Sequence, residues 1–157
     1  MDTRWLLFLH LAGAFSLVGG SLAAAVLRLA AMGRSRPSEI ALLLRAVRPA
    51  VPLVAGGLVL AVAAGSWLAD RLGYDLGGSW LTASYALTAW LLVVGAVAGR
   101  QDRRTRELAE RLAHDGDAPD AELVRRLRDP VNLALNATLL AAIVAVLALM
   151  VWKPGAS

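Results

Sequence analysis

Four long stretches of this sequence contain no Asp, Glu, Lys or Arg. They are residues Trp5–Leu27, Pro49–Ala69, Leu76–Gly99 and Pro130–Trp152. A helix that crosses a bilayer needs about 20 mostly apolar residues, and each stretch is long enough. Strands of a membrane barrel would alternate apolar and polar residues, which these stretches do not do. They therefore predict an all-α, transmembrane four-helix bundle with spans at about 5–27, 49–69, 77–99 and 130–152.

The composition is typical of a membrane protein rather than a soluble one. Of the 157 residues, 58% are hydrophobic and 18% are charged, whereas soluble domains have about 45–50% apolar and about 25% charged residues. The chain has no Cys, which excludes a disulfide scaffold and a zinc–thiolate site.

We expect a single integral membrane domain over residues 1–157. Ala23-Ala24-Ala25 resembles a signal-peptide cleavage site, but the apolar run is too long for a signal peptide, so we interpret it as a helix of the mature protein.

The arginines indicate the orientation of the spans. Five lie between the first and second spans and eight between the third and fourth, out of 16 Lys and Arg in all. Because cytoplasmic segments are enriched in Lys and Arg, we expect both segments in the cytoplasm and both termini outside it. Trp5, Trp67, Trp80 and Trp152 fall at the opposite ends of the spans, where aromatic side chains favour the membrane–water interface. This pattern predicts a multi-pass protein of the bacterial cell (inner) membrane.

The net charge of +4 does not indicate a nucleic-acid partner. Nine acidic residues share the two arginine-rich segments, and Arg103 with Glu107 and Arg106 with Glu110 have the spacing of ion pairs on a helix. Such mixed-charge segments are attracted to anionic lipid headgroups. The expected partner is therefore the lipid bilayer.

Both arginine-rich segments are expected to form amphipathic cytoplasmic helical extensions. The apolar residues of the first follow the i, i+3, i+4, i+7 spacing of one helix face, at Ile40, Leu43, Leu44 and Val47. The second has Leu123, Val124 and Leu127 ahead of Asp129-Pro130, an N-cap and N1 pair for the last span.

His10 is the candidate ligand-binding residue. It lies about 7 Å below the outer membrane boundary, at 1.5 Å per helical residue, and an ionisable residue inside a membrane suggests a function. A neutral imidazole can bind haem iron or copper, or relay a proton. The alternative is a neutral histidine that is hydrogen-bonded to a hydroxyl or carbonyl of a neighbouring helix. The other histidine, His114, lies in the cytoplasmic segment, so a two-histidine haem site would need a second copy or another subunit.

Small residues and two asparagines are the remaining candidates. Small residues at four-residue spacing let membrane helices approach closely; they are Ala12, Ser16, Gly20, Ala24, Gly57, Ala61, Gly65, Gly95 and Gly99. Asn132 and Asn136 lie one turn apart at the inner end of the last span. We expect them to cap a helix or to bond across helices, with contact to a substrate or ion as the alternative.

Two short motifs resemble a known family. Trp5-Leu6-Leu7-Phe8-Leu9-His10-Leu11-Ala12-Gly13-Ala14, followed by Val18-Gly19-Gly20, resembles the first helix of an uncharacterised bacterial family of four-helix integral membrane proteins. Leu149-Met150-Val151-Trp152-Lys153-Pro154 is similar to the end of that family. The first-helix pattern is also more distantly similar to copper-resistance D-type proteins and to haem-binding membrane protoporphyrinogen oxidases. That similarity implies a metal or haem role for His10.

The sequence leads to three hypotheses for function. The first is a small, non-catalytic membrane protein that acts as a homo-oligomer or as an accessory subunit of a larger membrane complex, because no catalytic or metal-binding motif is present. The alternative is a haem b-binding redox or haem-handling protein with His10 as an axial ligand. The third is a small transporter or a copper-related permease.

Overall fold

A computed structural model describes residues 3–75 and 77–152 of the chain. This part contains helices and no strand, with the elements α1 (Thr3–Met32), α2 (Pro37–Ala46), α3 (Ala50–Arg71), α4 (Ser79–His114), α5 (Ala121–Leu127) and α6 (Pro130–Trp152). Four helical segments are long and apolar enough to cross a membrane. The predicted all-α fold with four spans is confirmed.

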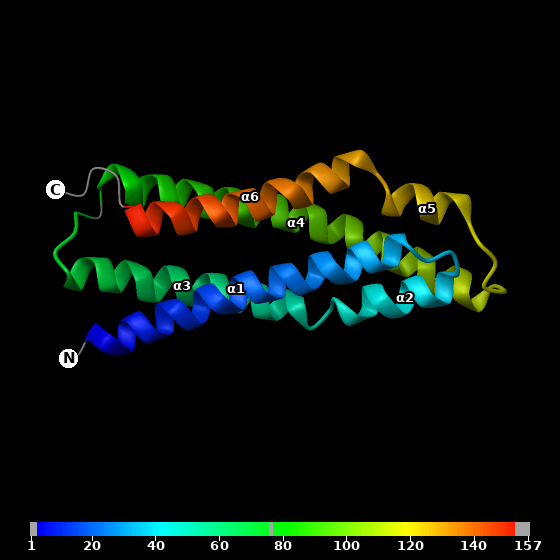
Figure 1. Cartoon of the computed structure of the whole chain (residues 1–157), viewed down its shortest axis with the longest axis horizontal. Helices are drawn as coiled ribbons and strands as arrows, with labels where there is room; N and C mark the ends of the chain where they lie inside the picture. Colours follow the sequence, from blue (N-terminus) through cyan, green and yellow to red (C-terminus); the bar gives the residue numbers. More distant parts are fainter. Residues whose placement is uncertain (1–2, 76, 153–157) are drawn as a thin grey trace.

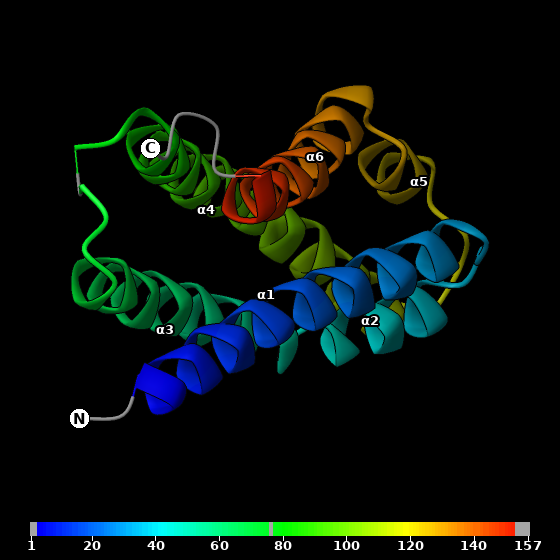
Figure 2. The same ribbon diagram turned by 60° about the vertical axis from the view of Figure 1, so that its left-hand side comes forward.

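The spans form two antiparallel pairs. α1 packs against α3 and α4 packs against α6, and the two pairs appear as separate layers in Figure 2. α2 packs against both α1 and α4, so it connects the layers. Figure 1 shows that α1 begins and α6 ends at the same end of an elongated molecule, here named the tryptophan end, and that α2 and α5 lie at the other end. We name this second end, formed by residues 28–49 and 100–130, the arginine-rich end.

Local sequence signals explain where the helices begin and end. α1 ends at Met32, before Gly33, and Pro37 occupies the first turn of α2, where its missing N–H costs no hydrogen bond. The carboxylate of Asp129 accepts a hydrogen bond from the amide of Asn132 at 3.2 Å, as expected for an N-cap. α4 begins at Ser79, because Gly78 has φ −55° and ψ 143° and precedes the first helical turn.

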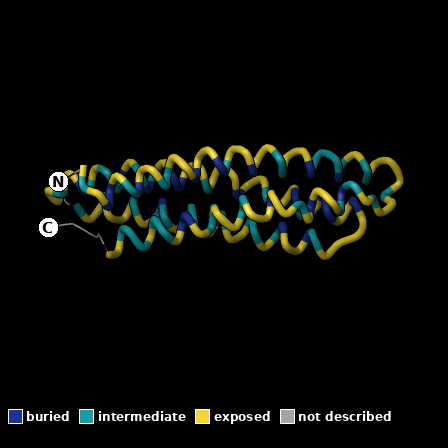
Figure 3. The backbone as a smooth tube through the Cα atoms, turned by 90° about the horizontal axis from the view of Figure 1, so that it is seen from above, coloured by how far each residue is buried: buried dark blue, intermediate teal, exposed yellow. Residues whose placement is uncertain are grey.

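A compact hydrophobic core lies at the arginine-rich end. Its side chains come from α1, α2, α4 and α5, and they are Ala31, Ile40, Ala41, Leu44, Ala109, Leu123 and Leu127. Burial of one such large apolar side chain away from water stabilises the fold by about 1.5–3 kcal/mol. Along the spans most side chains are exposed or only partly buried instead (Figure 3), as expected for helices surrounded by lipid. The amphipathic segments therefore join the two helix pairs through an ordinary hydrophobic core.

The α1–α3 contact depends on glycine. A Cβ atom added to Gly13 would lie 2.5 Å from the Ala61 main-chain nitrogen and 2.7 Å from the Gly57 oxygen. A Cβ added to Gly57 would lie 2.7 Å from the Gly13 oxygen and 2.8 Å from Cβ of Ser16. Because these neighbours are mostly backbone atoms, the two helices can approach this closely only where side chains are absent.

The other predicted packing residues differ in their surroundings. A Cβ on Gly20 would lie 2.7 Å from a methyl group of Val54, and Ala61 is buried. Ala12 and Ala24 are half-buried on α1. A Cβ on Gly95 or Gly99 would meet nothing within 4 Å, because α4 contacts α6 and α2 through its other faces. Gly95 and Gly99 therefore make no close helix contact within the described residues.

Candidate functional site

A cavity of about 320 Å³ lies between the two helix pairs at the tryptophan end. All four spans contribute to its walls, with Leu11 from α1, Val62 from α3, Leu81 from α4 and Leu147 from α6 among the lining residues. The lining is mostly apolar. Its polar side chains are His10, Ser66, Tyr74, Trp80, Ser84, Tyr85 and Thr88. Apolar walls with a few polar groups are typical of small-molecule sites.

His10 is held against α3 by a hydrogen bond. Its Nδ1 lies 2.8 Å from the main-chain oxygen of Ala61. A carbonyl oxygen can only accept, so Nδ1 carries the proton and Nε2 of the neutral ring keeps its lone pair. The ring fits because position 65 is glycine: a Cβ there would lie 2.6 Å from Nδ1. The structure thus pairs the predicted ligand residue with a carbonyl of the neighbouring helix.

Hydroxyl groups of both helix pairs line the cavity. The Tyr85 hydroxyl on α4 is 2.7 Å from Ser66 Oγ on α3, so this hydrogen bond joins the two helix pairs. Ser66 Oγ donates to the Val62 carbonyl at 2.8 Å. Ser84 and Thr88 donate in the same way to carbonyls one turn earlier on α4, each at 2.8 Å.

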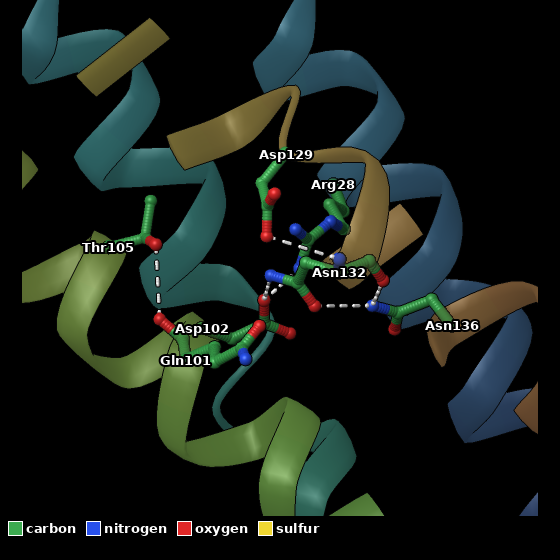
Figure 4. Close-up of polar contacts among 7 residues, drawn as sticks. All are labelled: Arg28, Gln101, Asp102, Thr105, Asp129, Asn132 and Asn136. Atoms are coloured by element: carbon green, nitrogen blue, oxygen red, sulfur yellow. Dashed lines mark hydrogen bonds and ion pairs between the residues drawn. The ribbon is translucent and has the colours of Figure 1, made fainter. Parts of the chain in front are cut away.

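A second polar cluster lies near the arginine-rich end and connects α1, α4 and α6 (Figure 4). The guanidinium of Arg28 forms an ion pair with the carboxylate of Asp102. The same carboxylate oxygen accepts a hydrogen bond from Asn132 Nδ2 at 3.3 Å. Asn136 Nδ2 donates to the main-chain oxygen of Asn132 at 2.8 Å and to its Oδ1 at 3.0 Å. Both asparagines therefore belong to one network, and Asn132 bonds across helices.

Arg28 is almost completely buried, with 7% of its surface exposed. Its Nε and Nη2 are buried without a hydrogen-bond partner in residues 3–75 and 77–152. Asp102 forms the ion pair with Arg28, and the charge of Asp129 also acts on this guanidinium. A buried ion pair contributes little net stability, but removal of one partner leaves an uncompensated charge.

A wider hollow of about 650 Å³ lies beside this cluster, between α4 and the connection from α5 to α6. It is lined by four arginines together with mostly polar residues: Arg104, Arg125, Arg126, Arg128, Gln101, Thr105, Asp129, Pro130 and Asn132. Some of this charge is paired, since Glu122 accepts a hydrogen bond from Arg126 at 2.7 Å and forms an ion pair with Arg125. The surplus of positive charge suits an anion such as a lipid phosphate.

His10 supplies one imidazole for a haem or metal. His114 ends α4 at the arginine-rich end, far from the cavity, whereas the thioether of Met150 belongs to the cavity wall. The described residues contain no group of three or more His, Asp or Glu that could hold a metal ion. Axial ligation of haem b by His10 stays a prediction.

Sequence reasoning assigned Arg28 and Asp102 to cytoplasmic segments and missed that they pair. α1 continues as a helix beyond Arg28, so this arginine lies on the packed part of the helix. One signal was available: Arg28 follows His10 by 18 residues, which is about five helical turns, so both side chains lie on one face of α1. Met150 and Tyr85 carried no comparable signal, because their contacts depend on how the two pairs are placed.

A comparison with protein families identifies one match. The family model described as predicted integral membrane protein (DUF2269) matches residues 4–154. No curated protein and no solved structure matches the chain significantly. The more distant similarity to copper-resistance D-type proteins and to protoporphyrinogen oxidases stays a prediction.

Proposed function

This chain belongs to the DUF2269 family of predicted integral membrane proteins, and from that premise we propose that it is non-catalytic and acts as a homo-oligomer or as an accessory subunit of a larger membrane complex. The observation that carries the proposal is the open face of α4 at Gly95 and Gly99. A Cβ at either position would meet nothing within 4 Å, and nearby Leu92 and Val93 are more than half exposed. Membrane helices associate through such small residues at four-residue spacing.

The absence of cysteine makes a direct test simple. Gly95→Cys carries a short photo-crosslinker in native membranes, and Gly19→Cys on α1 is the matched control, because a Cβ at Gly19 also meets nothing within 4 Å. We expect a crosslink from position 95 to a second copy of the chain or to one other membrane protein, and no crosslink from position 19. Crosslinks to lipid alone from both positions would contradict the proposal.

We also propose that the arginine-rich end faces the cytoplasm of a bacterial cell, with both termini on the other side of the inner membrane. The arginine-lined hollow at this end supports the proposal, because the cytoplasmic leaflet attracts basic segments. Trp5, Trp67 and Trp152 are at least half exposed at the opposite end, where an interfacial belt is expected.

The orientation is tested by labelling intact spheroplasts with a membrane-impermeant maleimide. Ser35→Cys lies between α1 and α2, and Gly77→Cys lies between α3 and α4. We expect Gly77→Cys to react before lysis and Ser35→Cys to react only after it. The reverse order would contradict the proposed topology.

A further inference from the structure

The imidazole of His10 presents a hydrogen-bond acceptor to the cavity. The Nδ1 proton is already bonded to the Ala61 carbonyl at 2.8 Å, so Nε2 carries a lone pair and no hydrogen. Among the described residues, some side-chain nitrogens are fully buried without a hydrogen-bond partner, and Nε2 of His10 is not one of them. His10 also lines the cavity. Its lone pair is therefore accessible to a ligand.

Four hydroxyl groups of the cavity, those of Ser66, Ser84, Tyr85 and Thr88, are also acceptors. Ser66 uses its hydrogen on the Val62 carbonyl, so its 2.7 Å contact with Tyr85 is a hydrogen bond only if Tyr85 donates. Ser84 and Thr88 use their hydrogens on carbonyls of α4. Each of these oxygens keeps a lone pair, but none has a hydrogen left to donate. Around His10 the cavity consequently favours a ligand that donates.

Donors occur at the loop end of the cavity, in Tyr74 and Trp80, whose rings meet edge to face at 5.8 Å. The described lining includes no Asp or Glu. A cation would therefore enter an apolar site without a compensating charge, which is costly. The combination of lone pairs and apolar walls fits an uncharged molecule with a hydroxyl donor.

The cavity is accessible from the bilayer. Its volume of about 320 Å³ is near the lower end of the range for small-molecule sites. Leu7, Leu11 and Val151 line it and also have a substantial exposed surface, so the cavity is open where these residues form its wall. A lipid-soluble molecule can reach the site between the two pairs without crossing water.

We propose that this cavity binds an uncharged, lipid-soluble molecule through a hydroxyl group that donates a hydrogen bond to Nε2 of His10. Hydroquinones and isoprenoid alcohols share this chemistry. A quinone or an ether of the same shape only accepts hydrogen bonds, so it leaves Nε2 unpaired. The proposal goes beyond the assembly role proposed above and does not depend on the oligomeric state.

The test compares each hydroxyl compound with its own methyl ether. The purified full chain in lipid nanodiscs is titrated, under nitrogen, with decyl hydroquinone and its dimethyl ether, and with farnesol and farnesyl methyl ether. In at least one pair we expect the hydroxyl compound to bind about tenfold more tightly, the effect of roughly one hydrogen bond. The pair of compounds that shows this difference in affinity identifies the class of ligand, a hydroquinone or an isoprenoid alcohol. Equal affinity within both pairs, or no binding of any probe, would overturn the proposal.

His10→Phe keeps an aromatic ring and removes the acceptor, so the tenfold preference should disappear. Thr138→Val is the control. Thr138 Oγ1 donates a hydrogen bond to the Leu135 carbonyl of its own helix at 2.8 Å. Because Thr138 lies outside the cavity lining, this variant should keep the preference for the hydroxyl compound. If His10→Phe keeps the preference, the proposal is wrong.

A second measurement requires no variant. In wild-type protein with 15N-labelled histidine, the Nε2 resonance of His10 should shift with the hydroxyl probe and not with its ether. An unchanged Nε2 resonance would overturn the proposal. So would a Soret band in the purified protein that His10→Phe abolishes, because Nε2 would then ligate haem iron.

Discussion

The imidazole of His10 on α1 donates a hydrogen bond from Nδ1 to the main-chain oxygen of Ala61 on α3, across 2.8 Å. The absence of a side chain at Gly65 gives the ring its space. One contact between two helices thus determines both the tautomer of the ring and the direction in which its free lone pair is available. The properties of the cavity follow from the close packing of α1 against α3.

Gly65→Ala is expected to displace the imidazole. The new Cβ would lie 2.6 Å from Nδ1 and 2.8 Å from Cε1 of His10, so the ring must rotate and lose the bond to Ala61. The loss should lower the free energy of unfolding by about 1 kcal/mol and change the 15N shift of Nδ1. Gly56→Ala on the same helix, where a Cβ meets nothing within 4 Å, should leave both unchanged. Equal behaviour of the two variants would contradict the expectation.

Gly13→Ala should be more damaging than Gly65→Ala. Its Cβ would lie 2.5 Å from a main-chain nitrogen and 2.7 Å from a main-chain oxygen of α3, and backbone atoms cannot rotate away. The α1–α3 pair must separate, at a cost of about 1–3 kcal/mol. Thermal unfolding in detergent measures the loss, with Gly19→Ala on the same helix as the control. A melting temperature equal to that of the control would show that the two helices are not in close contact.

Asp102→Asn should leave the buried charge of Arg28 without its ion-pair partner, with only the charge of Asp129 to compensate it. Breaking a buried ion pair costs about 3–5 kcal/mol, and the lower end applies because the Asp102 side chain is 34% exposed. Arg28→Met combined with Asp102→Leu removes both charges and should recover most of the stability. Glu107→Gln, which breaks the exposed pair with Arg103, should cost far less, because solvent screens exposed charges. Chemical unfolding in mixed micelles compares these variants, and equal losses for the Asp102 and Glu107 variants would contradict a buried pair.

The hydrogen bonds between Asp117, in the loop after α4, and Ser38, at the start of α2, should depend on pH. The Asp117 carboxylate accepts hydrogen bonds from Ser38 Oγ and from the Ser38 amide, each at 2.7 Å, and these bonds lower the pKa of Asp117. Because the folded-state pKa is lowered, the contact is fully formed above the ordinary aspartate pKa of about 3.9. It is lost as the pH falls through the lower value.

An NMR titration of the Asp117 carboxyl carbon checks this expectation. Ser38→Ala removes the hydroxyl donor and should raise the pKa of Asp117 toward the ordinary value. Ser35→Ala, in the loop just before α2, should not change it, because the hydrogen bonds of Asp117 come from Ser38. An Asp117 pKa that Ser38→Ala leaves unchanged would mean that the hydroxyl bond is absent in solution.

Much of the secondary structure follows from local signals in the sequence. Runs free of charge predict the spans, and the Asp129-Pro130 pair marks the start of the last helix, which the structure confirms. These signals are local because a helix satisfies its own backbone hydrogen bonds, which is obligatory in lipid. The sequence also predicted the apolar face of α2, where Ile40 and Leu44 are buried. The prediction succeeded because the burial of apolar side chains away from water decides which face of α2 packs against the other helices.

The pairing of the helices was decided by the tertiary structure. Gly57 and Gly95 look alike in the sequence, yet Gly57 touches the backbone of α1 and Gly95 touches nothing. Arg28 and Asp102 are 74 residues apart. They pair only because α2 packs against both α1 and α4 and so brings the two helix pairs together at this end. Lipid solvates every apolar face of a membrane helix equally well, so the spacing of small residues does not indicate which face packs. The sequence alone determined which segments are apolar enough to enter the membrane. Which helices pack together, and where the cavity beside His10 lies between them, was decided only by the close contact of one helix backbone with another.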